Sequence, residues 1–85
     1  MDGKARMAAE EAIRALSRED APGARTAISE AYDIDHSLGG LADLVHLACS
    51  EIETTDRVST ATWNALADAV AHDDLLAVIE GSRSS

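Results

Sequence analysis

The sequence is poor in large hydrophobic side chains. It has no phenylalanine, and Tyr32 and Trp63 are its only aromatic residues. Hydrophobic residues make up 46% of the chain, but 17 of these 39 are alanines, which favour helices strongly and bury little area. A chain of 85 residues forms one domain at most. We therefore expect a thin core, completed by close helix packing or by a dimer that shares core between its chains.

Cysteine and long apolar segments are also scarce. The single cysteine, Cys49, has no second cysteine in the chain to pair with, which fits a reducing compartment. The first six residues are charged and do not lead into an apolar segment as long as that of a signal peptide. No window holds the twenty or so apolar residues of a membrane span. These features predict a cytoplasmic protein.

Basic residues are few and unevenly distributed, within a net charge of −9. Residues 1–25 contain five bases and five acids, whereas residues 26–85 contain two bases and eleven acids. Phosphate backbones are repelled by such a surface, so we expect no direct contact with nucleic acid. A basic protein would be attracted to it. We nevertheless interpret the charge first as a solvated surface that keeps the protein soluble.

Apolar residues recur at helical spacing, and strand signals are nearly absent. We predict helices over residues 3–17, 21–33 and 38–54, a fourth from Ser59 or Thr60, and a short last helix after Asp73 or Asp74. This pattern predicts an all-α fold, a compact bundle or orthogonal array of four to five short helices. The helical domain is expected to span residues 1–81 and to be followed by a frayed polar tail over 82–85.

Caps and inward faces follow from the same periodicity. Predicted capping residues are Asp2, Asp20 and either Asp35 or Ser37 at N-termini, and Gly81 at the last C-terminus. The second helix should turn inward Ala21, Ala24, Ile28, Ala31 and Tyr32. The third helix should bury Leu38, Leu41, Ala42, Val45, Ala48, Cys49 and Ile52. Trp63 is expected on the inward stripe of the fourth helix, substantially buried.

The segment ARTAISEAYDIDHS, residues 24–37, resembles the second helix and exit of a tetratricopeptide repeat. The small, bulky, small and exit positions of that motif match Ala24, Ile28, Ala31 and the Ile34-Asp35 pair, and His36 replaces the usual proline. The resemblance implies tetratricopeptide-like helical hairpins as an alternative fold. The first helix lacks the aromatic and glycine positions of the motif.

A second segment, HSLGGLADLVHLACSEI, resembles the modified region of acyl carrier proteins. There a serine-leucine pair opens the helix that receives phosphopantetheine. The resemblance implies Ser37 as the attachment residue and Leu38 as its companion. The chain departs from that family because a predicted helix and His36 replace the long irregular loop and the aspartate before the serine.

Catalytic and metal-binding signatures are weak. His46 shares a helix face with Asp43 and Glu53, which is half of a zinc site, but neither other histidine stands at a suitable spacing. We therefore interpret the three residues as a solvated polar face. Cys49 lies on the buried stripe, where an apolar setting raises a thiol pKa and makes it unreactive. We therefore predict no enzyme, no metal and no cofactor.

The third predicted helix has apolar residues outside its main stripe, namely Gly40, Leu44 and Leu47. Such a helix is either central in the domain or packs a second face against a partner. We therefore predict a small non-enzymatic interaction or accessory protein, which binds a second copy of itself through these residues or binds another, basic protein. The alternatives are a carrier-like protein modified on Ser37 and an acidic antitoxin-like or nucleic-acid-mimicking inhibitor.

Overall fold

Helices form wherever apolar residues recur at helical spacing. The computed structural model describes residues 2–71 and 74–83. Over these residues the elements are α1 (Gly3–Ser17), α2 (Ala21–Ile34), the short 3-10 helix η1 (His36–Leu38), α3 (Gly39–Thr55), α4 (Thr60–Ala69) and α5 (Leu75–Arg83). The prediction of an all-α bundle is confirmed.

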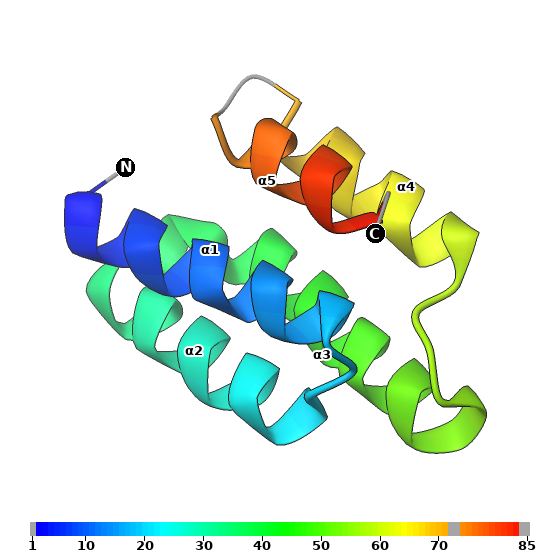
Figure 1. Cartoon of the computed structure of the whole chain (residues 1–85). Helices are drawn as coiled ribbons and strands as arrows, with labels where there is room; N and C mark the ends of the chain where they lie inside the picture. Colours follow the sequence, from blue (N-terminus) through cyan, green and yellow to red (C-terminus); the bar gives the residue numbers. More distant parts are fainter. Residues whose placement is uncertain (1, 72–73, 84–85) are drawn as a thin grey trace.

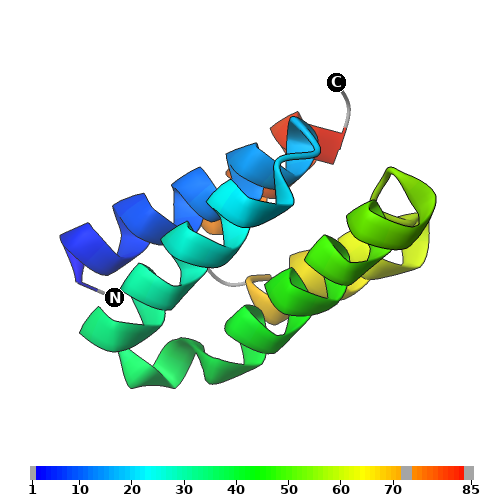
Figure 2. The same cartoon turned by 90° about the horizontal axis from the view of Figure 1, so that it is seen from below.

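Consecutive helices run in alternating directions (Figure 1). Each helix packs against the next one, and α5 returns to pack against α1 (Figures 1 and 2). The helices therefore close into a bundle. In a tetratricopeptide array each hairpin contacts only its neighbours along the chain, so the contact between α1 and α5 argues against that alternative.

The predicted N-caps have the expected hydrogen bonds. The carboxylates of Asp2 and Asp20 accept from backbone amides in the first turns of α1 and α2. The Ser59 hydroxyl, which was not among the predicted caps, does the same for α4. Of the two candidates before the third predicted helix, Asp35 is the cap and Ser37 is not, because the Asp35 carboxylate accepts from the Ser37 amide at the start of η1. The Asp35 cap serves η1, and α3 has no side-chain cap of its own because its backbone continues directly from η1.

The last helix is longer than predicted. Gly81 lies inside α5, which continues to Arg83, so the predicted cap at Gly81 and the frayed tail are wrong for residues 82 and 83. The guanidinium of Arg83 donates to Asn64 Oδ1 at 2.8 Å and ties the last turn to α4. Residues 84 and 85 lie outside the described residues, and so does Asp73, one of the two residues after which the last helix was expected to begin.

Alanines line the contact between α1 and α2, where they let the two backbones approach closely. The buried alanines of these helices are Ala5, Ala9, Ala12, Ala15, Ala21, Ala24, Ala27 and Ala31. The largest fully buried side chains are Ile13, Leu16, Ile28, Leu66, Leu75 and Ile79. The predicted inward stripe over residues 38–52 is buried at every position. Trp63 is only partly buried and packs against the edge of this core.

Candidate functional site

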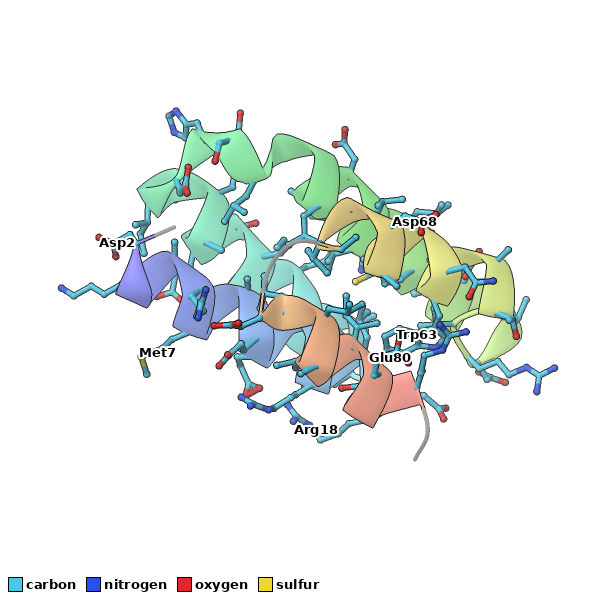
Figure 3. The ribbon with its side chains drawn as sticks, turned by 90° about the horizontal axis from the view of Figure 1, so that it is seen from above. Asp2, Met7, Arg18, Trp63, Asp68 and Glu80 are labelled. Carbon is cyan, nitrogen blue, oxygen red and sulfur yellow. The ribbon has the colours of Figure 1, made fainter. Side chains whose placement is uncertain are left out.

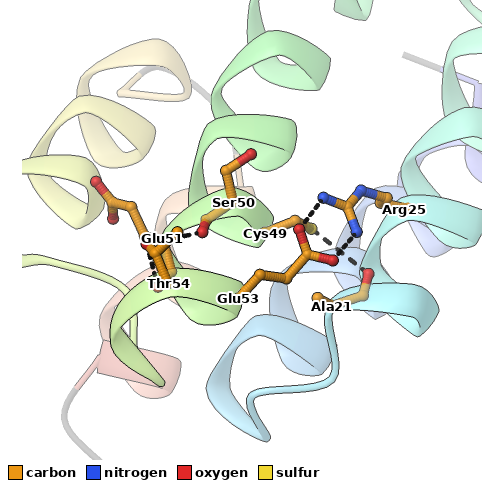
Figure 4. Close-up of polar contacts among 7 residues, drawn as sticks. All are labelled: Ala21, Arg25, Cys49, Ser50, Glu51, Glu53 and Thr54. Carbon is orange, nitrogen blue, oxygen red and sulfur yellow. Dashed lines mark hydrogen bonds and ion pairs between the residues drawn. The ribbon is translucent and has the colours of Figure 1, made fainter.

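A two-pronged ion pair joins α2 to α3 (Figure 4). Arg25 Nη1 and Nη2 donate to Glu53 Oε2 and Oε1, each at 2.7 Å. These hydrogen bonds lower the pKa of Glu53, against a smaller opposing effect of burial, and raise the pKa of Arg25. Because Glu53 is held by Arg25, it does not join His46 and Asp43 in a metal site. The described residues contain no group of three or more potential metal ligands.

Cys49 is fully buried beside this ion pair, as the sequence predicts. Its thiol lies 3.5 Å from the backbone carbonyl of Ala21, to which it donates (Figure 4). Burial raises the pKa of the Cys49 thiol, and this outweighs the opposite effect of the nearby Arg25 charge. Such a thiol is protonated, inaccessible and a poor nucleophile.

Ser37, the attachment residue implied by the carrier resemblance, is exposed at the start of η1. Its hydroxyl donates to Asp35 Oδ1 at 2.6 Å, and its amide donates to the same oxygen at 3.0 Å. Both bonds lower the pKa of Asp35, the side-chain bond most. Helix α2 ends at Ile34, so the connection before Ser37 is short and capped, unlike the long irregular loop of carrier proteins.

The predicted interaction surface on α3 consists of Gly40, Leu44 and Leu47. These three residues differ in how accessible they are to a partner. Leu44 is partly buried against the core. Leu47 is 49% exposed, so it is not a core residue of the single chain. No neighbouring atom lies within 4 Å of the position that a Cβ would occupy at Gly40. The accessible part of this surface is therefore Gly40 and Leu47.

A groove lies between α2 and α3, and nothing in the spacing of the sequence predicts it. We call it the α2–α3 groove. It encloses about 360 Å³ and is lined by Ile28, Ser29, Tyr32, Asp33, Gly39, Ala42, Asp43 and His46. Tyr32, which was expected to point inward, is 40% exposed here and stacks on the ring of His36 with 4.9 Å between centroids. The inward prediction for Tyr32 is wrong, because its side chain lines the groove and stacks on His36 instead of packing into the core.

The acidic surface is only partly neutralised. Four arginines pair with carboxylates, namely Arg6 with Asp74, Arg14 with Glu10, Arg18 with Glu11 and Arg25 with Glu53. Six further carboxylates form neither an ion pair nor a side-chain hydrogen bond with any described residue. We call them the six open carboxylates: Glu19, Glu30, Asp33, Asp43, Asp56 and Asp68. Two of them, Asp33 and Asp43, line the α2–α3 groove.

Comparison of the chain with protein-family models, with curated proteins and with solved structures finds no match. Within residues 2–71 and 74–83, every helix is too short or too polar to cross a membrane.

Proposed function

We propose that this protein acts without catalysis, by binding a basic protein through its acidic surface. The observation that carries the proposal is the set of six open carboxylates, none of which forms an ion pair with a described residue. Such a surface attracts a positively charged partner over distances of about a Debye length, roughly 8–10 Å at physiological salt.

The bound partner is a protein in which basic residues are clustered. Toward this partner the protein acts as an accessory protein or as an acidic antagonist. Charged residues of this kind contribute to the rate and specificity of association more than to its free energy, so the complex is sensitive to salt. We place the protein in the cytoplasm, where its single buried thiol stays reduced.

The test is capture from a lysate of the native cells on the immobilised protein, followed by elution with a salt gradient and mass spectrometry. The comparison variant carries Gln or Asn at all six open carboxylates and is first checked by circular dichroism to be folded. We expect one or a few basic proteins on the wild-type protein, eluted by moderate salt and missing from the variant. Equal retention on both proteins, or no basic protein on the wild type, would contradict the proposal.

A second function, self-association, is favoured by the exposure of Leu47. A symmetric dimer through Gly40, Leu44 and Leu47 would cover this side chain and bury apolar surface in addition to the alanine-rich core. Gly40 leaves room for a close helix–helix approach. The net charge of −9 opposes this association, so the dimer should weaken at low salt.

A further inference from the structure

We infer that the α2–α3 groove binds an arginine side chain of the basic partner. This inference rests on the proposed function and states where on the acidic surface the partner is recognised. The groove combines acidic side chains, an exposed aromatic ring and an apolar floor, which are the three features that a guanidinium and its aliphatic stem require.

The charge of the groove favours a cation. Asp33 on α2 and Asp43 on α3 both line it, and both belong to the six open carboxylates. No lysine or arginine is among the residues that line this groove. The planar guanidinium has five N–H donors, so one arginine satisfies carboxylates from two directions, which a single ammonium group does less well.

The aromatic ring of Tyr32 adds a preference for arginine over lysine. Tyr32 lines the groove, is 40% exposed, and is supported by the stacked ring of His36 at an interplanar angle of 27°. A guanidinium that lies on a tyrosine face gains both cation–π attraction and stacking. Gly39 lies beside the ring, and a Cβ there would come within 3.5 Å of Tyr32 Cε1.

The size of the groove suits one side chain. Its volume of about 360 Å³ lies at the lower end of the range for small-ligand pockets. Ile28 is fully buried beneath the groove, so the apolar surface for the methylene groups of the arginine stem comes from Ala42 and from the ring of Tyr32. The remaining lining residues, Ser29 and His46, offer hydrogen-bonding groups at its margin.

The experiment measures fluorescence polarisation of a short arginine-glycine-serine peptide titrated with the full-length protein at low salt. Two double variants are compared, Asp33→Asn with Asp43→Asn in the groove, and Asp56→Asn with Asp68→Asn away from it. Both variants remove the same number of charges from open carboxylates. We expect the groove variant to weaken binding about tenfold and the control variant less than about threefold, because only the groove carboxylates touch the guanidinium.

A second comparison uses the same peptide with lysine in place of every arginine, and the variant Tyr32→Leu. The wild-type protein should bind the arginine peptide several-fold more tightly, and Tyr32→Leu should remove most of this difference. Equal weakening by the two double variants would overturn the groove inference and leave the acidic-surface proposal standing. Absence of measurable binding to the arginine peptide would also overturn the inference, whereas the lysate capture tests the proposed function independently.

Discussion

Leu47 differs from the other leucines of α3 because its side chain is half exposed. Leu41 is buried on the inner stripe and Leu44 is partly buried at its edge, whereas Leu47 lies on the opposite side of the helix. Met7 on α1 is even more exposed, at 70%, and points away from the bundle (Figure 3). Single exposed apolar residues are common, so only a measurement of association separates a surface residue from an interface residue.

The first residue-scale prediction concerns Leu47→Asp. The variant should stay folded, with a free energy of unfolding within about 0.5 kcal/mol of wild type, because no core contact is lost. If two chains associate through α3, the same variant should sediment as a monomer where the wild type sediments as a dimer, since the change buries an unpaired charge.

The control is Met7→Asp, which adds the same charge at an exposed apolar position of another helix. It should change neither the sedimentation nor the free energy of unfolding. A wild-type protein that sediments as a monomer at high concentration would exclude the dimer. An unfolded Leu47→Asp chain would show that this residue belongs to the core.

At the scale of elements, a side chain of α3 completes the N-terminus of α4. Glu51 Oε1 accepts from the Ser59 amide at 2.9 Å, and Oε2 accepts from Thr62 Oγ1 at 2.7 Å and Ser59 Oγ at 3.2 Å. The Ser59 hydroxyl in turn accepts from the Thr62 amide. A carboxylate at this place also interacts favourably with the dipole of α4. Glu51 therefore fixes where α4 begins relative to α3.

The corresponding prediction is that Glu51→Gln destabilises the protein by about 1–2 kcal/mol at neutral pH, as the loss of hydrogen bonds to a charged acceptor implies. Burial alone would raise the pKa of Glu51, but the bonds from Ser59 and Thr62 outweigh it and lower the pKa below the ordinary 4.5. The carboxylate thus stabilises the fold fully above pH 4.5, and this stabilisation is lost as the pH falls through the lower folded-state pKa.

Urea unfolding of wild type and Glu51→Gln over a range of pH tests this prediction. The difference in free energy of unfolding should be constant above the ordinary pKa and should shrink below it. Asp43→Asn is the matched control on the same helix, because Asp43 forms no bond with a described residue. If the difference in free energy of unfolding between wild type and Glu51→Gln did not change with pH, the stabilisation would not come from the ionised carboxylate of Glu51.

At the scale of the whole molecule, the net charge of −9 leads us to expect that repulsion among acids exceeds the attraction of ion pairs. Among residues 2–71 and 74–83 there are six open carboxylates and four arginine–carboxylate pairs, and the net charge of the chain is −9. Salt screens both effects, so the dominant one decides the sign of the salt dependence. Self-repulsion of a highly charged chain favours expanded states. Added salt should therefore stabilise this fold.

The prediction is that raising sodium chloride from a few millimolar to about 0.5 M increases stability by about 1 kcal/mol, which corresponds to roughly 4–8 °C in Tm for a domain of this size. Differential scanning calorimetry measures the change. The variant neutralised at all six open carboxylates should show a clearly smaller increase. A Tm that falls with salt would mean that the ion pairs contribute more than the repulsion removes.

Features that depend on a few neighbouring residues were predictable from the sequence. The spans of α1 to α3, the start of α4, the caps at Asp2 and Asp20, and the buried stripe over residues 38–52 follow from periodicity and from short side chains next to helix starts. The burial of Cys49 follows from its place on that stripe. These signals are local because helical hydrogen bonds join residues four apart along the chain.

Features that join two helices were decided only by the tertiary structure. The pairs Arg25–Glu53 and Glu51–Thr62 depend on how far one helix slides and turns against the next, which no spacing within a helix determines. The same packing exposes Tyr32 and brings Asp33 and Asp43, ten residues apart in sequence, to one groove across the capped turn. Sequence periodicity locates the face that each helix buries, and only the packing angle decides which side chains at the edges of that face remain open to a partner.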